Sequence, residues 1–267
     1  MTTSTAEPRS AVPSPRGDDV WVVMFPLAAG DPLDAAHEAV LSAGERDRAA
    51  RMAAPVGRRF IAARGRLRRM LAQVLDDEPA AIEFTAGPRG KPALAGRHAG
   101  RCEFNLSHSR DWCLVALSTT RAVGVDLEVP RPTHTAAWAE LLAGSILSAG
   151  ELDAHRLLAD AERPRRLLEA WVAKEAVLKA TGTGVAGGVR HLAIPESVPR
   201  LRLAADAPPQ VVDLAAVPGA GPGRWGVCRL DLDGHGVAAV ACGARATGAL
   251  DCRIASVAPA RFGFTAG

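Results

Sequence analysis

Three carboxylate side chains in two separate segments of the sequence could together bind one metal ion. Asp126 and Glu128 lie two residues apart in the alternating segment 123–129 (VGVDLEV). On a β-strand their side chains point to the same face, with Cα atoms about 6.5–7 Å apart, so both can reach one cation. Glu175 adds a third carboxylate from a segment with a helical pattern. Oxygen ligands that leave positions for water and phosphate are typical of Mg²⁺, with Mn²⁺ as an alternative.

Glu175 is conspicuous because it interrupts the apolar face of its own helix. Residues 165–180 (RRLLEAWVAKEAVLKA) predict a helix whose apolar side chains form a continuous arc, and Glu175 lies near the middle of that arc. A buried carboxylate without a partner is strongly unfavourable. One interpretation is an ion pair with Lys179, one helical turn further on. The other is a metal ion that Glu175 shares with Asp126 and Glu128.

The composition excludes several classes of protein. A chain of 267 residues with 48% hydrophobic and 23% charged residues fits an ordinary globular protein of one large or two small domains. No apolar run reaches the length of a membrane span, and a net charge of +3 is too small to indicate a nucleic-acid-binding protein. Five scattered cysteines without a CxxC pair favour a reducing cytoplasm.

The basic residues are almost all arginines. Of 32 Lys and Arg residues, three are lysines, namely Lys91, Lys174 and Lys179. In such a chain a retained lysine can mark a position that needs a compact point charge rather than a planar guanidinium group. Two of the three lie in the helix of Glu175, and the third lies in a Gly-Lys-Pro turn.

The elements that must position these side chains predict a mixed α+β fold. We expect strands at 20–27, 80–84, 104–108, 112–118 and 123–129, helices at 42–52, 57–75, 136–142, 148–158 and 165–180, and a closing hairpin of 225–231 with 237–242. Residues 195–224 are rich in Pro, Ala and Gly and predict a loose segment.

The two halves of the sequence also resemble each other. Segments 58–71 (RRFIAARGRLRRML) and 165–178 (RRLLEAWVAKEAVL) share several positions in register. This pattern indicates a pseudo-twofold duplication of two similar α/β subdomains, with the active site in the cleft between them. We expect a disordered tail at 1–18, an N-terminal subdomain at 19–122, a C-terminal subdomain at 123–242 and an extension at 243–267. Since the duplication supplies both halves of the cleft, we expect a monomer.

Five short segments, taken in order, resemble one enzyme family. They are Gly-Lys-Pro at 90–92, NLSHS at 105–109, GVDLE at 124–128, LSAGE at 147–151 and WVAKEAVLK at 171–179. Over about residues 42–184 the chain resembles the 4′-phosphopantetheinyl transferases of the surfactin-synthetase-activating type. The resemblance implies transfer of the phosphopantetheine arm of coenzyme A to a serine of an apo acyl or peptidyl carrier protein, with release of 3′,5′-ADP. It also implies a cytoplasmic, Mg²⁺-dependent enzyme that activates polyketide, nonribosomal peptide or fatty acid synthases.

The resemblance also assigns roles to single residues. Asp126, Glu128 and Glu175 would hold Mg²⁺ against the diphosphate, and Glu175, directly or through a metal-bound water, would take the proton of the serine. Lys179 would contact the diphosphate. A cationic pocket for the 3′-phosphate of coenzyme A would include Arg48, Arg59, Lys91, Ser107 and His108, with Lys174 as a further phosphate contact. Arg58 and Arg64 are alternatives to Arg59 in the same arginine-rich segment. Among these, Glu175, Lys179 and His108 are the candidate catalytic residues.

The chain departs from the family pattern at several positions, and two alternative functions remain. Glu45 stands where relatives often carry a basic residue, so coenzyme A contacts there are in doubt. The main alternative is an Mg²⁺-dependent nuclease or phosphodiester hydrolase, because acids beside lysines also suit that chemistry. A second alternative, an arginine-rich binding module built on residues 57–75, leaves Glu175 unexplained.

Overall fold

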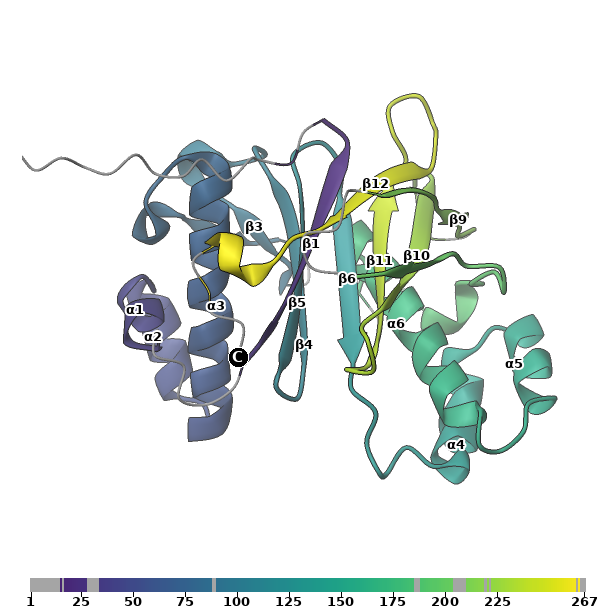
Figure 1. Cartoon of the computed structure of the whole chain (residues 1–267). Coiled ribbons are helices and arrows are strands. Elements are labelled where there is room, and N and C mark those ends of the chain that lie inside the picture. The colour runs from purple at the N-terminus through teal and green to yellow at the C-terminus, as the bar shows by residue number, and fades with distance from the viewer. Residues whose placement is uncertain are drawn as a thin grey trace, which may run out of the picture.

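The protein is built of four layers in the order helix, sheet, sheet, helix (Figure 1). The structure is a computed structural model, and it describes residues 15, 17–27, 34–87, 90–184, 188–203, 210–218, 220, 222–262 and 264. Two long helices, α3 (Ala54–Leu75) and α6 (Arg163–Thr181), form the outer layers. Among the described helices, none combines the length and the apolar character that crossing a membrane requires.

The first sheet has five strands in the order β4-β5-β1-β12-β8. Their bounds are β4 Glu103–Ser109, β5 Trp112–Ser118, β1 Asp19–Pro26, β12 Asp251–Ser256 and β8 Gln210–Asp213. Only β1 and β12 pair in parallel. Helix α3 covers the outer face, where Leu67, Met70 and Leu71 pack against Phe25 and Phe104. The short helices α1 (Asp34–Ala39) and α2 (Ala43–Ala50) lie beside α3.

The second sheet has the order β6-β11-β10-β7, with the short β9 also paired to β10. The bounds are β6 Val123–Glu128, β11 Val237–Gly243, β10 Trp225–Asp231, β7 Arg200–Arg202 and β9 Ala215–Ala216. Helix α6 lies so close to β6 that a Cβ on Gly124 would come within 2.1 Å of the Ala176 carbonyl oxygen. Gly124 therefore permits the approach that brings α6 against the polar side of β6. Helices α4 (Ala136–Ile146) and α5 (Ala149–Arg156) pack at the far end of α6.

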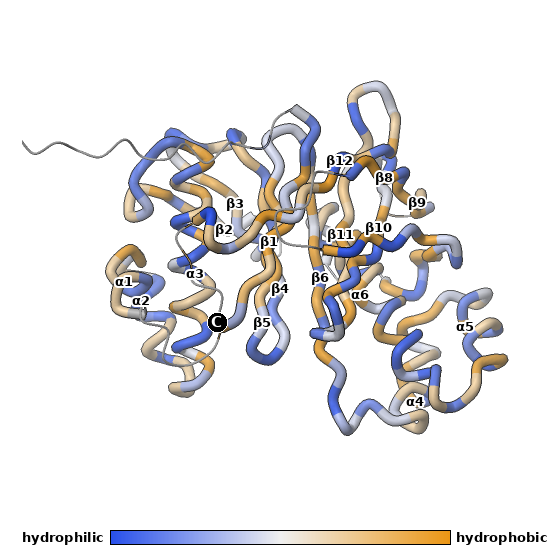
Figure 2. The backbone as a smooth tube through the Cα atoms, in the orientation of Figure 1, coloured by the Kyte–Doolittle hydropathy of each residue, from blue (hydrophilic) through white to orange (hydrophobic). Residues whose placement is uncertain are grey.

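The inner faces of the two sheets pack on each other. Val123, Val125 and Leu127 of β6 meet Val22 of β1 and Leu114 of β5 in one buried cluster. Figure 2 shows these strands as largely hydrophobic. Because the side chains of a strand alternate, the polar residues of β6 point the other way, toward α6.

The predicted mixed α+β class is confirmed, and the closing hairpin is correct. Two local predictions are wrong. Residues 80–84 do not form one strand, since a 3₁₀ turn, Pro79–Ala81, precedes β2 (Phe84–Ala86), which pairs with β3 (Pro92–Leu94). The segment 195–224, expected to be loose, supplies β7, β8 and β9. Three further 3₁₀ turns are Gly96–His98, Val189–His191 and Pro259–Phe262.

The segment expected as a C-terminal extension supplies β12, which lies inside the first sheet between β1 and β8. Most of the expected N-terminal tail, and positions 88–89 of the Gly-Lys-Pro turn, lie outside the described residues. The domain boundaries and the internal duplication stay predictions.

Candidate active site

The candidate active site lies along the line where the two sheets meet edge to edge, which we call the seam. Strand β4 is an edge of the first sheet and β6 is an edge of the second. Side chains of β4 bond to the backbone of β6 and of the residue that follows it. Asn105 Oδ1 accepts from the Val125 N–H at 2.9 Å, and Ser109 Oγ accepts from the Val129 N–H at 3.0 Å. The NLSHS and GVDLE segments are therefore held side by side.

Asp126 lies at the centre of the seam and is already partnered on one oxygen. Its Oδ1 accepts hydrogen bonds from Lys179 Nζ at 2.6 Å and from Ser107 Oγ at 2.7 Å. Lys179 also donates to Ser107 Oγ at 3.1 Å. Lys179 thus pairs with Asp126, and the alternative ion pair with Glu175 is not found among the described contacts. Ser107, expected at a phosphate, instead orients Asp126.

Two carboxylate oxygens at the seam lack a partner. Asp126 Oδ2 and Glu175 Oε1 are both buried without a hydrogen bond in the structure as described. Burial raises the pKa of Glu175, and the nearby charges of Asp126 and Glu128 raise it further, while Lys179 opposes them. Three carboxylates therefore act on one another electrostatically, and a cation would relieve both the repulsion and the missing contacts.

The acids are not arranged as a finished metal centre. Over the residues that the structure describes, no group of three or more His, Cys, Asp or Glu side chains is placed so that it could hold a metal ion. The chemistry of the residues nevertheless suits Mg²⁺, because carboxylate and hydroxyl oxygens are hard ligands. Like Asp126, Glu128 accepts a hydrogen bond from a serine of β4: its Oε2 accepts from Ser109 Oγ at 2.8 Å. The serine partners, Ser107 and Ser109, could have been expected from their alternation along β4.

A pocket of about 530 Å³, which we call the basic pocket, opens at one end of the seam, between α3, the β4–β5 turn and the end of β6. Its ionisable lining residues are Arg48, Arg59, His108, Arg110, Asp111, Glu128 and Arg131. Arg59 forms an ion pair with Asp111 at 2.6 Å, and Arg48 stacks over the Phe60 ring. The expected residues Arg48, Arg59 and His108 are thus brought together.

His108 in this pocket favours the neutral imidazole. Partial burial lowers its pKa, and the positive charges of Lys179 and Arg59 lower it further, while Glu128 acts in the opposite direction. A neutral ring can accept a proton or donate one hydrogen bond. The sequence analysis did not single out Arg110 and Arg131. Arg110 directly follows the NLSHS segment, and Arg131 lies three residues after the GVDLE segment. Closeness to these motifs was the signal that could have identified them.

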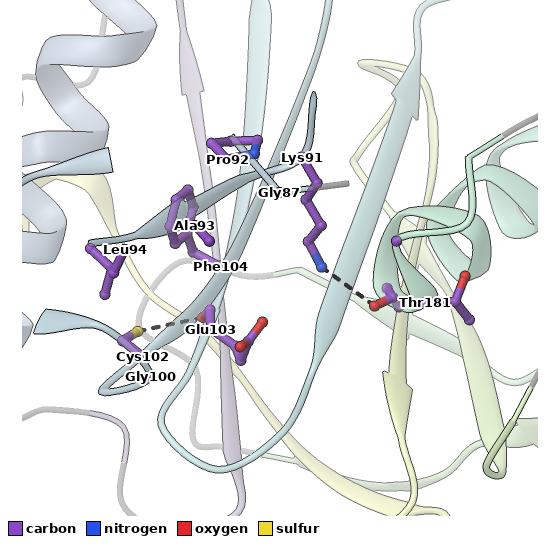
Figure 3. A pocket seen from close by; sticks show the side chains of 12 residues that line it. Gly87, Lys91, Pro92, Ala93, Leu94, Gly100, Cys102, Glu103, Phe104 and Thr181 are labelled. Atoms are coloured by element: carbon purple, nitrogen blue, oxygen red, sulfur yellow. Dashed lines mark hydrogen bonds between the residues drawn. The ribbon is translucent and has the colours of Figure 1, made fainter. Parts of the chain in front are cut away.

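Lys91 does not join the basic pocket, contrary to the sequence prediction. It lines a separate pocket of about 250 Å³, where its side chain points toward the end of α6 beside Thr181 (Figure 3). Its ammonium donates to the carbonyl oxygens of Val123 at 3.3 Å and Ala180 at 3.4 Å. Val123 begins β6 and Glu128 ends it, about 16 Å further along the strand. The two pockets therefore lie at opposite ends of the seam.

Lys174, expected as a phosphate contact, also lies elsewhere than the basic pocket. It is fully buried, and its ammonium donates to Glu151 Oε2 at 2.6 Å and to the Ile146 carbonyl oxygen at 2.7 Å. Glu151 accepts two more hydrogen bonds from the backbone N–H groups of Ser148 and Ile194. Lys174 thus fixes α6 to the corner between α4 and α5 and is not available to a ligand.

Glu45, the acid found in place of a basic residue, has a structural role. It completes a capping box with Ser42 at the start of α2. Its carboxylate also pairs with Arg68 at 2.8 Å and with Arg64 at 3.4 Å. These contacts hold α2 against α3, so the departure from the family pattern is explained by packing.

The sequence is similar to those of known proteins. The model of the 4′-phosphopantetheinyl transferase superfamily matches residues 122–215, which include β6 and α6. A putative 4′-phosphopantetheinyl transferase of Synechocystis sp. is 35% identical over 179 residues, covering 66% of this chain and 71% of the relative. The 4′-phosphopantetheinyl transferase HetI of Nostoc sp. is 39% identical over 171 residues, covering 63% and 71%.

A phosphopantetheinyl transferase of Thraustochytrium sp. is 33% identical over 189 residues, covering 66% of this chain and 65% of the relative. Two of these matches extend over more than two thirds of the relative. This chain therefore belongs to the 4′-phosphopantetheinyl transferase superfamily and is an enzyme of that class.

Proposed function

We propose that this enzyme transfers the 4′-phosphopantetheine arm of coenzyme A to a serine of an apo acyl or peptidyl carrier protein. The serine oxygen forms a bond to the phosphorus next to the pantetheine, the bond to the other phosphate breaks, and 3′,5′-ADP leaves. The observation that carries the proposal is the pair of unpartnered carboxylate oxygens, Asp126 Oδ2 and Glu175 Oε1, beside the ammonium of Lys179.

We propose Asp126, Glu128 and Glu175 as the residues that hold Mg²⁺. A bound Mg²⁺ ion supplies neutralisation of the diphosphate and of the charge that develops on the leaving phosphate. The hydroxyls of Ser107 and Ser109 orient two of these carboxylates through hydrogen bonds of 2.7 and 2.8 Å. Such supporting contacts keep ligand side chains in place before a ligand arrives.

Glu175 is our candidate for the group that takes the serine proton. Its raised pKa makes it a better proton acceptor than an exposed glutamate. Lys179, on the next turn of α6, donates to Asp126 and so lies beside the carboxylates that we propose as metal ligands. From there its ammonium can donate to a phosphate oxygen when the ligand binds. His108, neutral and at the mouth of the basic pocket, can donate one hydrogen bond to the substrate.

We assign the 3′-phosphate of coenzyme A to the basic pocket, with Arg48, Arg59 and His108 as contacts. Lys91 remains a candidate contact to coenzyme A, but at the opposite end of the seam. Burial lowers the pKa of its ammonium group there. A ligand with phosphates in the middle and at one end matches such an extended arrangement. Lys174 is left out of the site because its ammonium is bonded elsewhere.

The remaining finer assignments are also proposals. We infer that the protein is a cytoplasmic monomer of the surfactin-synthetase-activating type, that it activates polyketide, peptide or fatty acid synthases, and that its halves arose by duplication. The support for duplication is the arrangement of a long helix on the outer face of each sheet, α3 on the first and α6 on the second.

The test is to incubate the protein with coenzyme A, Mg²⁺ and several apo carrier proteins and to weigh the carriers by mass spectrometry. We expect a mass gain of one phosphopantetheine arm on the carrier serine, and loss of the gain when Mg²⁺ is chelated. Glu162→Gln, an exposed glutamate at the start of α6, is the matched control for Glu175→Gln.

The rival function, an Mg²⁺-dependent phosphodiester hydrolase, predicts a different product pattern. It requires cleavage of coenzyme A or of a nucleic acid in the absence of any carrier protein. Cleavage without a carrier, together with no mass gain on any carrier tested, would replace the transferase proposal by the rival.

A further inference from the structure

Arg110 has an unusual backbone conformation for an arginine. In the described part of the chain, three residues other than glycine have a positive φ: Asp76 at 55°, Arg110 at 53° and Asp233 at 50°. Aspartate tolerates this region, because its short side chain can hydrogen-bond to nearby backbone groups. Arginine has no such compensation, so its presence at this position calls for another reason.

The turn that contains Arg110 is one in which glycine is normally found. Ser109 of β4 pairs with Trp112 of β5, which leaves Arg110 and Asp111 as a two-residue turn. Arg110 has positive φ, and Asp111 does not. A two-residue hairpin turn with positive φ at its first central position favours glycine there.

The turn is held from several sides and cannot easily relax. The Asp111 carbonyl oxygen accepts from the Leu27 N–H at 2.6 Å, and its carboxylate accepts from Arg59. The ring of Trp112 lies 4.3 Å from that of His235, which belongs to the turn between β10 and β11. These contacts fix the place from which the Arg110 side chain extends.

Arg110 is one of the residues that line the basic pocket, and among the described residues it forms no ion pair with a carboxylate. The pocket has two acids: Asp111 forms an ion pair with Arg59, and Glu128, which accepts from Ser109 Oγ, can balance the charge of only one further arginine. Arg48, Arg110 and Arg131 therefore leave an excess of positive charge in the pocket. Such an excess is suited to an anion with several oxygen acceptors.

We propose that Arg110 is a binding residue for the phosphate group at the nucleotide end of coenzyme A. The unfavourable φ is retained because glycine, which would suit the turn, has no side chain to reach the phosphate. This inference rests on the proposed function and on the assignment of the 3′-phosphate to the basic pocket. The inference adds Arg110, in the β4–β5 turn, to the residues proposed to contact the 3′-phosphate.

The experiment compares binding of coenzyme A and of 3′-dephospho-coenzyme A by calorimetry, with Mg²⁺ present, in the full-length protein. The variants are Arg110→Gly and Arg110→Asn, which both tolerate positive φ and remove the charge, and Arg110→Lys, which keeps the charge. Asp76→Gly is the matched control, because it replaces another residue with positive φ at the end of α3.

We expect Arg110→Gly and Arg110→Asn to weaken coenzyme A binding about fivefold to tenfold and to leave dephospho-coenzyme A binding unchanged. Arg110→Lys should recover most of the affinity. The melting temperature of Arg110→Gly should rise by about 1–3 °C, because the glycine relieves the backbone. Binding should weaken while stability increases, and Asp76→Gly should not change binding.

Three results would overturn the inference. Unchanged affinity for coenzyme A in both neutral variants would show that Arg110 does not contact the phosphate. An equal loss for both ligands would show that the turn, not the charge, matters. If the unaltered protein itself does not distinguish the two ligands, the assignment of the basic pocket in the proposed function fails instead, and Arg110 with it.

Discussion

Helix α6 carries two lysines, five residues apart, and each forms an ion pair of the same length with an acid. Lys174 pairs with Glu151 and Lys179 pairs with Asp126, both at 2.6 Å. The first lysine side chain is 0% exposed, and the second is 28% exposed. By distance alone the two pairs are equivalent, yet they belong to different parts of the molecule.

The difference lies in the atoms that surround each pair. Around Lys174 every oxygen of Glu151 is engaged, by the lysine and by two backbone N–H groups. Around Lys179 two carboxylate oxygens remain without partners, one on Asp126 and one on Glu175. A saturated pair fixes the fold, whereas an unsaturated one leaves room for a ligand. Unmet hydrogen bonds thus distinguish the two sites better than the ion pairs do.

The largest effect is expected for Glu175→Gln, which removes the charge on the unsaturated side while keeping the size of the side chain. We expect the turnover number to fall about 10²- to 10⁴-fold, because the proposed proton acceptor and metal ligand is lost. The fold should remain, as judged by circular dichroism and thermal melting. Transfer of the phosphopantetheine arm at the full rate would remove Glu175 from the mechanism.

The saturated side is tested by Lys174→Met, which keeps the length of the side chain without its charge. Breaking a buried pair leaves Glu151 without its counter-ion, so the free energy of unfolding should fall by about 3–5 kcal/mol. Urea denaturation measures this loss. The turnover number of the folded fraction at low temperature should change by no more than about twofold. A stable but inactive variant would return Lys174 to the substrate site.

Lys179→Met, in contrast to Lys174→Met, should mainly reduce activity. We expect kcat/KM to fall about 10- to 100-fold, as expected for a lost charged hydrogen bond to a phosphate. In this variant Asp126 loses its ion-pair partner and Glu175 loses a nearby positive charge. Mg²⁺ should therefore raise the melting temperature of the variant more than that of the unaltered protein. Equal responses to Mg²⁺ in Lys174→Met and Lys179→Met would erase the distinction between the two pairs.

The smallest effect concerns pH. Because burial and nearby acids raise the pKa of Glu175, its carboxylate should become available as a proton acceptor only as the pH rises through that raised pKa. Lys179 opposes this effect, so Lys179→Met should move the acidic limb of the kcat/KM profile to higher pH. A carboxyl whose pKa is raised by folding stabilises the fold at low pH and loses that contribution as pH increases through the raised pKa. The melting temperature of metal-free Glu175→Gln should therefore exceed that of the unaltered protein at neutral pH and approach it near pH 4.

Local patterns were enough to predict most of the elements that build the site. Strict alternation placed Asp126 and Glu128 on one face of β6, and helical periodicity made Glu175 conspicuous. These predictions hold because the periods of strand and helix depend on neighbouring residues alone. The strands β7, β8 and β9 escaped notice since they are short and form only by pairing with distant partners.

The roles of the individual cations could not be read in the same way. Lys174 and Glu175 are adjacent in the sequence, and about 100° apart around the helix, so one faces the α4–α5 corner while the other faces the seam. Lys91 follows a turn whose direction depends on the pairing of β2 with β3. The conformation of Arg110 is a property of a turn held by three other elements.

The sequence by itself determined the chemical groups, their local faces and the family to which their order points. The tertiary structure decided which of those groups meet. It brought β4 and β6 edge to edge and let α6 approach at Gly124, so that acids and a lysine distant in the sequence share one partly buried space. The physical reason is that a charge acquires its role from burial and from the partners it lacks, and both are set by packing between distant segments.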